Sequence, residues 1–198
     1  MGLVIGIIVA VVIVLLLIFV IAGYNGLVRA RNAYKNAFAQ IDVQLRRRFD
    51  LIPNLIETAK AYMAHERQTL ESVVAARGAA MNGLAAAQAN PGDPAAMQQL
   101  AAGQQALDGA LSRLNIVVEQ YPDLKANQNM QQLQEELTST ENKVAFARQA
   151  FNDAVLGYNN ACQNFPGNLI ANNFSFKPAE FLEIEQPEKR AVPKVSFS

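Results

Sequence analysis

The segment from Leu3 to Ala22 constrains this chain most, because it contains no charged or strongly polar side chain. As an α-helix, its 20 residues span roughly 30 Å, which is the thickness of the hydrocarbon core of a bilayer. The alternative is a removable signal peptide, which has a basic start, a shorter apolar core and a small-residue cleavage site. Only Met1 and Gly2 precede the apolar segment, and Ala22-Gly23-Tyr24 is a poor cleavage site. The sequence therefore predicts a retained transmembrane anchor over residues 1–23.

Small residues recur inside this segment. Gly2, Gly6 and Ala10 follow one another at four-residue spacing, which places them on one face of a helix. Such a face lets two membrane helices approach closely. The spacing predicts packing of the anchor against a second copy in a homo-oligomer, although glycine and alanine are also common in membrane helices in general.

The charged residues are distributed unevenly along the chain. The first cations are Arg29, Arg31 and Lys35, and short basic flanks tend to stay in the cytoplasm. We therefore expect the N-terminus outside and the following domain inside the cell. Residues 29–48 carry a net charge of +5 and residues 50–166 a net charge of −5. A basic segment beside the membrane suits lipid headgroups as partners, whereas an acidic body does not suit nucleic acid.

Apolar residues recur at steps of three and four through residues 24–166, which is the pattern of amphipathic helices. Breaks are expected at Pro53, at the turn Asn90-Pro91-Gly92-Asp93-Pro94 and at Tyr121-Pro122-Asp123. We predict an all-α fold in which an antiparallel four-helix bundle follows the anchor. A single rod formed by the first two helices and kinked at Pro53 stays open as an alternative to a hairpin. The predicted helices of the bundle cover residues 24–50, 51–89, 94–121 and 124–165, all with approximate ends.

The fourth predicted helix is the most regular one. Its large side chains fall seven residues apart and predict a buried row: Leu137, Val144, Phe151, Tyr158 and Phe165. Residues 167–198 are expected to form an extended tail that docks on the bundle or on a neighbouring subunit. Cys162 is the only cysteine, so no intrachain disulfide can form, and we expect it to be a small buried hydrophobe.

The sequence lacks the residue patterns that carry catalysis or bind metals. His65 is the only histidine, and no Glu-x-x-His pair or second histidine at metalloprotease spacing accompanies it. No nucleophile elbow, phosphate-binding loop or dinucleotide fingerprint occurs. We therefore expect a protein that is not an enzyme, with no catalytic residue, no metal and no cofactor. A cryptic hydrolase is the less favoured interpretation.

Several polar residues fall toward the faces on which the predicted helices meet. They are candidates for a hydrogen-bonded network that fixes the register of the helices, and the alternative is a patch that contacts a partner protein. The six candidates are Asp42, Asn54, Glu57, Glu141, Asn142 and Arg148.

Three stretches resemble the signature of the bacterial LemA family, and together with the anchor the similarity covers nearly the whole chain. The first and most specific stretch is Ile41-Asp42-Val43-Gln44-Leu45-Arg46-Arg47-Arg48-Phe49-Asp50-Leu51-Ile52-Pro53-Asn54-Leu55. The second runs from Glu136 to Arg148 and is followed by Tyr158-Asn159, and the third is Val195-Ser196-Phe197 near the end.

The resemblance implies an N-terminal membrane anchor, a helical-bundle domain and no established enzymatic activity. Some members lie beside genes for membrane metallopeptidases, and one branch takes part in building magnetosome membranes. We therefore expect a non-enzymatic scaffold that forms homo-oligomers at the bacterial inner membrane. The alternative is a modulator or adaptor of a membrane metallopeptidase.

Overall fold

The computed structural model describes residues 1–183, and within them every regular element is a helix, which confirms the all-α prediction. Val195-Ser196-Phe197 and the rest of the predicted tail after residue 183 lie outside the described residues. The helices are α1 (Gly2–Lys60), α2 (Arg67–Ala89), α3 (Pro94–Val118), α4 (Pro122–Lys125), α5 (Gln128–Gln163) and α6 (Gly167–Asn173).

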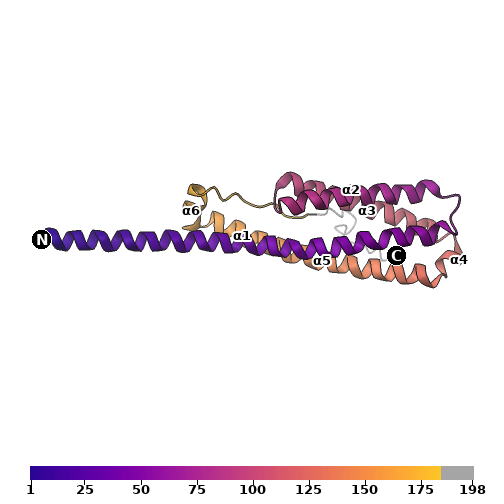
Figure 1. Ribbon diagram of the computed structural model, residues 1–198, viewed down its shortest axis with the longest axis horizontal. Helices are drawn as coiled ribbons and strands as arrows, with labels where there is room; N and C mark the ends of the chain where they lie inside the picture. Colours follow the sequence, from indigo (N-terminus) through magenta and orange to yellow (C-terminus); the bar gives the residue numbers. More distant parts are fainter. Residues whose placement is uncertain (184–198) are drawn as a thin grey trace, which may run out of the picture.

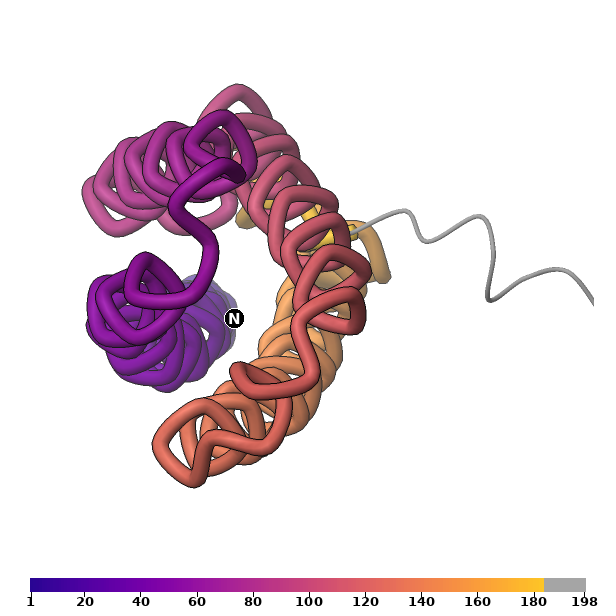
Figure 2. The backbone as a smooth tube through the Cα atoms, turned by 90° about the vertical axis from the view of Figure 1, so that its right-hand side faces the viewer, coloured from indigo at the N-terminus to yellow at the C-terminus, as the bar shows by residue number. Residues whose placement is uncertain are grey.

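Four long helices run side by side in alternating directions, and the leading part of α1 projects alone from one end of this bundle (Figure 1). Viewed from the α4 end, the helices follow one another around the bundle in the order α1, α2, α3 and α5 (Figure 2). Helix α1 packs chiefly along α5, and α2 packs chiefly along α3. The arrangement is the antiparallel bundle that the apolar pattern predicts.

The boundary predicted at Pro53 is wrong, because α1 continues through this proline to Lys60. A proline has no N–H, so the carbonyl of Phe49, four residues earlier, loses its partner within the helix. Arg77 of α2 supplies a replacement, since its Nε donates to the Phe49 carbonyl at 2.8 Å. The first turn of the bundle therefore lies at residues 61–66, where polar residues interrupt the apolar pattern. Neither a helix over 24–50 nor one over 51–89 exists as predicted.

The turn between α2 and α3 lies where the sequence predicts it. Asp93 accepts a hydrogen bond from the Ala96 N–H at 3.0 Å, and Pro94 occupies the first turn of α3. This is the ordinary N-cap arrangement, in which a carboxylate replaces a missing helical acceptor. The fourth predicted helix begins later than expected, at Gln128, because α4 is a separate short helix.

The row of large residues predicted on the fourth helix is buried in the middle of α5, but α5 ends before the last residue of the row. Val144, Phe151 and Tyr158 are buried, and Phe151 contacts the aromatic rings of Tyr34 and Phe38 on α1. Phe165 lies outside α5, which ends at Gln163, and 80% of its surface is exposed. The prediction of a buried Phe165 is therefore wrong, because the heptad register holds only while the helix continues.

Candidate functional site

The C-terminal part of the described chain lies against the bundle as an extended segment. We call residues 174–183 the strap. It follows α6, so the predicted tail is helical over its first seven residues before it becomes extended. The strap places Phe176, Ala179 and Leu182 in buried positions. The three-residue spacing of these side chains matches a polyproline II chain, which has three residues per turn and directs every third side chain to the same side.

Two asparagines of α5 hold the backbone of the strap. The Asn159 side chain donates to the Ala179 carbonyl at 2.9 Å and accepts from the Ala179 N–H at 2.8 Å. Asn152 makes the same pair of hydrogen bonds with Leu182, at 3.3 Å and 2.9 Å. Seven residues of helix rise roughly 10 Å, and three residues of extended chain cover about the same length. The two carboxamides therefore match the repeat of the strap and bind its backbone rather than its side chains.

Further hydrogen bonds join the strap to α5 and to the turn between α2 and α3. The Tyr158 hydroxyl donates to the Lys177 carbonyl at 2.8 Å, and the Glu180 N–H donates to the Gly92 carbonyl at 2.8 Å. Gly92 has a φ of +85°, and a Cβ at this position would lie 2.8 Å from the Cβ of Ala179. Glycine is required here for its backbone conformation and for the close approach of the strap.

The hydroxyl and thiol groups beneath the strap are protonated at neutral pH. Burial is the main cause that raises the pKa of Tyr158 above its ordinary value, and a hydrogen bond with Cys162 contributes. Burial also raises the pKa of the Cys162 thiol. A thiol reacts as its thiolate, so this cysteine is an inert packing residue rather than a nucleophile, as the sequence predicts.

A second polar cluster joins the two helix pairs in the middle of the bundle. Arg48 of α1 is buried, and its guanidinium binds the carboxylate of Asp108 on α3 at 2.6 Å. The same side chain donates to the buried Gln104 at 3.4 Å. Because α1 continues to Lys60, Arg48 lies inside the helix rather than in its last turn. This charge bridges helices instead of opposing a helix dipole.

The six polar residues proposed from the sequence do not form one network among the described residues. Asn54, Glu57, Glu141 and Asn142 are exposed, while Asp42 and Arg148 are half-buried. Asp42 pairs with Arg46 one turn along α1 at 2.9 Å, and Glu57 pairs with Lys60 at 2.6 Å. Arg48, Gln104 and Asp108 join α1 to α3 instead, and a partner-contact role for the six residues stays a prediction.

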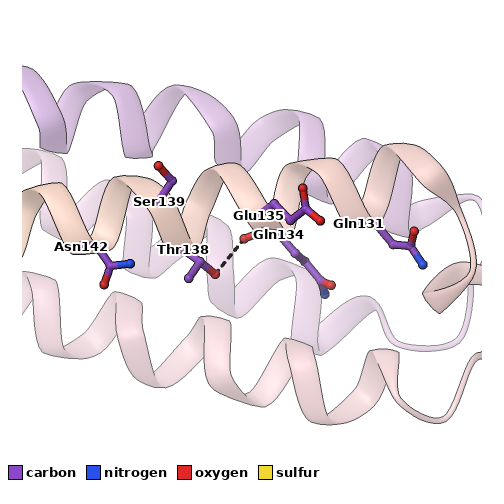
Figure 3. Close-up of a pocket in the computed structure, with 6 residues that line it drawn as sticks. All are labelled: Gln131, Gln134, Glu135, Thr138, Ser139 and Asn142. Carbon is purple, nitrogen blue, oxygen red and sulfur yellow. Dashed lines mark hydrogen bonds between the residues drawn. The ribbon is translucent and has the colours of Figure 1, made fainter.

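One of the six, Asn142, lies in a shallow polar depression on α5. Figure 3 shows its lining residues along a single helix: Gln131, Gln134, Glu135, Thr138, Ser139 and Asn142. The hydrogen bond drawn there runs from the Thr138 hydroxyl to the Gln134 carbonyl, at 2.9 Å. Sites for small molecules are usually concave and mostly apolar, with polar groups that converge from several elements. The residues that line this depression all come from α5, so it lacks such convergence.

His65 is exposed in the turn between α1 and α2. Over residues 1–183, His, Cys, Asp and Glu side chains do not gather in any group of three or more that could hold a metal ion. The polar side chains that do converge, under the strap and around Arg48, hold elements of the protein together.

Sequence reasoning missed the residues that hold the strap. Asn152 and Asn159 lie seven residues apart and directly follow Phe151 and Tyr158 of the buried row. This repeat is a signal that polar residues flank the buried face of α5. It does not reveal the partner, because the residues of the strap that bind Asn159 and Asn152 lie 20 and 30 residues further along the chain.

Replacing Asn159 by alanine should release the strap. The substitution leaves the buried N–H and carbonyl of Ala179 without partners, which costs about 2 kcal/mol. We expect faster hydrogen exchange in residues 176–183 of the full chain, measured by mass spectrometry. The matched control is Asn160→Ala, because Asn160 is exposed on the next position of the same helix. Unchanged exchange in the strap of Asn159→Ala would contradict the role of this side chain.

The relatives found by comparison with known proteins carry the same name. The chain is 27% identical to magnetosome protein MamQ of Magnetospirillum gryphiswaldense and 26% identical to magnetosome protein MamQ 2 of Paramagnetospirillum magneticum. Each match covers 83% of this chain and 65% of the relative, so the chain spans just under two thirds of these relatives' length. Neither name designates an enzyme. The family model of the LemA family matches residues 37–197, and with the long apolar helix, the bundle and the similar relatives this match shows that the chain belongs to the LemA family.

Proposed function

We propose that this protein is a membrane-anchored, non-enzymatic scaffold that forms homo-oligomeric assemblies at the bacterial inner membrane, with the helical domain in the cytoplasm. The observation that carries the proposal is the continuity of α1. One helix contains both a segment of mean hydropathy 3.8 that is not buried against the described chain and the residues that form one side of the bundle. Movement of the bundle is thereby linked directly to the membrane segment.

The apolar segment also has a surface suited to self-association. A Cβ added at Gly2 or Gly6 would meet nothing within 4 Å, so this face is free for a second helix. Glycines on a membrane helix let backbones pack closely, which replaces lipid contacts with van der Waals contacts between helices. The names of the relatives refer to the magnetosome rather than to a reaction, which agrees with a structural role.

The test is the mass of the full chain extracted into native-lipid discs. We expect a multiple of the monomer mass, and we expect Gly6→Leu to shift the distribution toward monomer by placing a large side chain on the packing face. Ile8→Phe enlarges a residue on the opposite face of the helix and is the matched control. A strictly monomeric wild-type protein would contradict the scaffold. A stoichiometric second protein in the discs would favour the alternative, an adaptor of a membrane metallopeptidase.

A further inference from the structure

The end of the bundle next to the apolar segment of α1 carries exposed apolar side chains. We call Tyr24, Phe165, Leu169 and Phe174 the corner. Phe165 is 80% exposed, Leu169 is 53% exposed and Phe174 is 51% exposed. The rings of Tyr24 and Phe174 contact each other edge to face with centroids 5.1 Å apart. Large apolar side chains that gather on a surface mark a site of interaction.

The corner lies at the level at which the apolar segment of α1 ends. Helix α6 is held against α1 by its inner face, where Ile170 and Ala171 are buried. Ile170 packs directly on Gly23, and an added Cβ at Gly23 would collide with it. Gly23 immediately follows the apolar segment that ends at Ala22. Figure 1 shows α6 beside α1 at the end of the bundle from which the lone part of α1 projects.

The charges around the corner have the pattern of a bilayer interface. Residues 154–176 contain no charged side chain, and α1 has none before Arg29. The first charges beyond these stretches are the exposed cations Arg29 on α1 and Lys177 on the strap, together with the exposed anion Asp153, which lies ten residues before the end of α5. Arg29 lies roughly 10 Å along the helix from Ala22, which places it at the outer edge of the headgroup region. An apolar and aromatic surface therefore lies below a layer of positive charge.

We propose that the corner is a second membrane-contacting surface, in which α6 and its flanking aromatic residues enter the interfacial region of the lipid bilayer. Aromatic rings are favoured at this depth, and cations just outside it attract anionic headgroups. This inference rests on the proposed anchoring of the apolar segment in the membrane. Because α6 leads directly into the strap, the contact also fixes the start of the strap at the membrane surface and sets the tilt of the bundle.

The absence of tryptophan from the sequence allows a direct test. Each of Phe165→Trp and Leu169→Trp gives a full-length protein with a single tryptophan at an exposed corner position. The probe is a lipid disc of phosphatidylcholine and phosphatidylglycerol in which part of the phosphatidylcholine carries bromine near the headgroup end of its acyl chains. We expect both variants to have blue-shifted emission and to lose emission when the brominated lipid is present.

Two control variants calibrate the quenching. Phe19→Trp lies in the apolar segment and is the positive control. Phe146→Trp lies in the middle of α5 and is the negative control, because Phe146 is 73% exposed in the wild type.

Quenching at the corner of the same order as at Phe19→Trp, with none at Phe146→Trp, supports the contact. If Phe19→Trp is quenched and the corner variants are not, the corner contact is wrong and the anchor stands. If Phe19→Trp is also unquenched, the anchor itself is wrong. Unquenched, blue-shifted corner emission that reddens on dilution assigns the surface to a second copy and overturns the proposal.

Discussion

Replacing Gly83 by leucine is expected to force α2 and α3 apart and to lower the free energy of unfolding by about 3 kcal/mol. The two helices cross at glycines that have no room for a side chain. A Cβ at Gly83 would lie 2.8 Å from the Gln99 carbonyl oxygen and 2.9 Å from the Leu100 Cα. Both contacts are with backbone, so a rotamer change cannot relieve them and the helices themselves must move.

Gly103 on α3 makes the reciprocal contact. A Cβ there would lie 2.9 Å from the Ala80 Cα, so Gly103→Ala should destabilise the fold in the same direction as Gly83→Ala. Gly109→Ala on the same helix is the matched control, because a Cβ there meets nothing within 4 Å. Alanine should stabilise this exposed helical position by about 0.5–1 kcal/mol. Equilibrium chemical denaturation of the full chain in a mild detergent measures the variants at all three glycines, Gly83→Leu included, and equal effects at Gly103 and Gly109 would contradict the close crossing.

Replacing Asp108 by asparagine is expected to destabilise the bundle by about 3 kcal/mol, because it leaves a buried guanidinium without its counter-charge. The Arg48 side chain is 6% exposed, and its ion pair with Asp108 joins α1 to α3. The control is Asp42→Asn, which removes a carboxylate from a surface pair with Arg46 along one helix. A surface pair of that kind contributes less than about 1 kcal/mol.

The double variant Arg48→Met with Asp108→Leu separates the cost of an unpaired buried charge from the contribution of the ion pair itself. Replacing both partners of a buried pair by apolar residues is often nearly neutral, whereas removing one is costly. We therefore expect the double variant to unfold at a higher denaturant concentration than Asp108→Asn. A double variant that is less stable than Asp108→Asn would show that the pair contributes more than the relief of a buried charge.

Local patterns predicted the all-α class, helix α3, most of α5 and the turn between α2 and α3 correctly, but they misplaced the boundary between the first two helices of the bundle. The apolar segment, the steps of three and four and the Asp93-Pro94 cap are all properties of neighbouring residues, so they can be seen without the fold. Pro53 wrongly predicted a helix boundary, because its local effect is to remove a hydrogen bond of the helix. The compensating donor, Arg77, comes from a different helix. The polar residues Glu66 and Arg67 were the better signal for the turn.

The candidate sites were less visible in the sequence. Arg48 is one of three consecutive arginines, and nothing local shows that Asp108, 60 residues later, lies opposite it. The asparagines of α5 likewise have a regular spacing but no apparent partner. Polar residues on amphipathic helices are ambiguous, because exposure and a buried contact between elements produce the same local pattern.

The sequence by itself determined the helical class, the apolar segment suited to a membrane and the missing patterns of catalysis and metal binding, since each depends on composition and short-range spacing. Only the tertiary structure decided that α1 passes through Pro53, that Arg48 crosses to Asp108, and that Asn152 and Asn159 hold the strap. These features depend on hydrogen bonds and charge pairs between residues far apart in the chain. Their partners are chosen by the packing of whole helices, which no short stretch of sequence encodes.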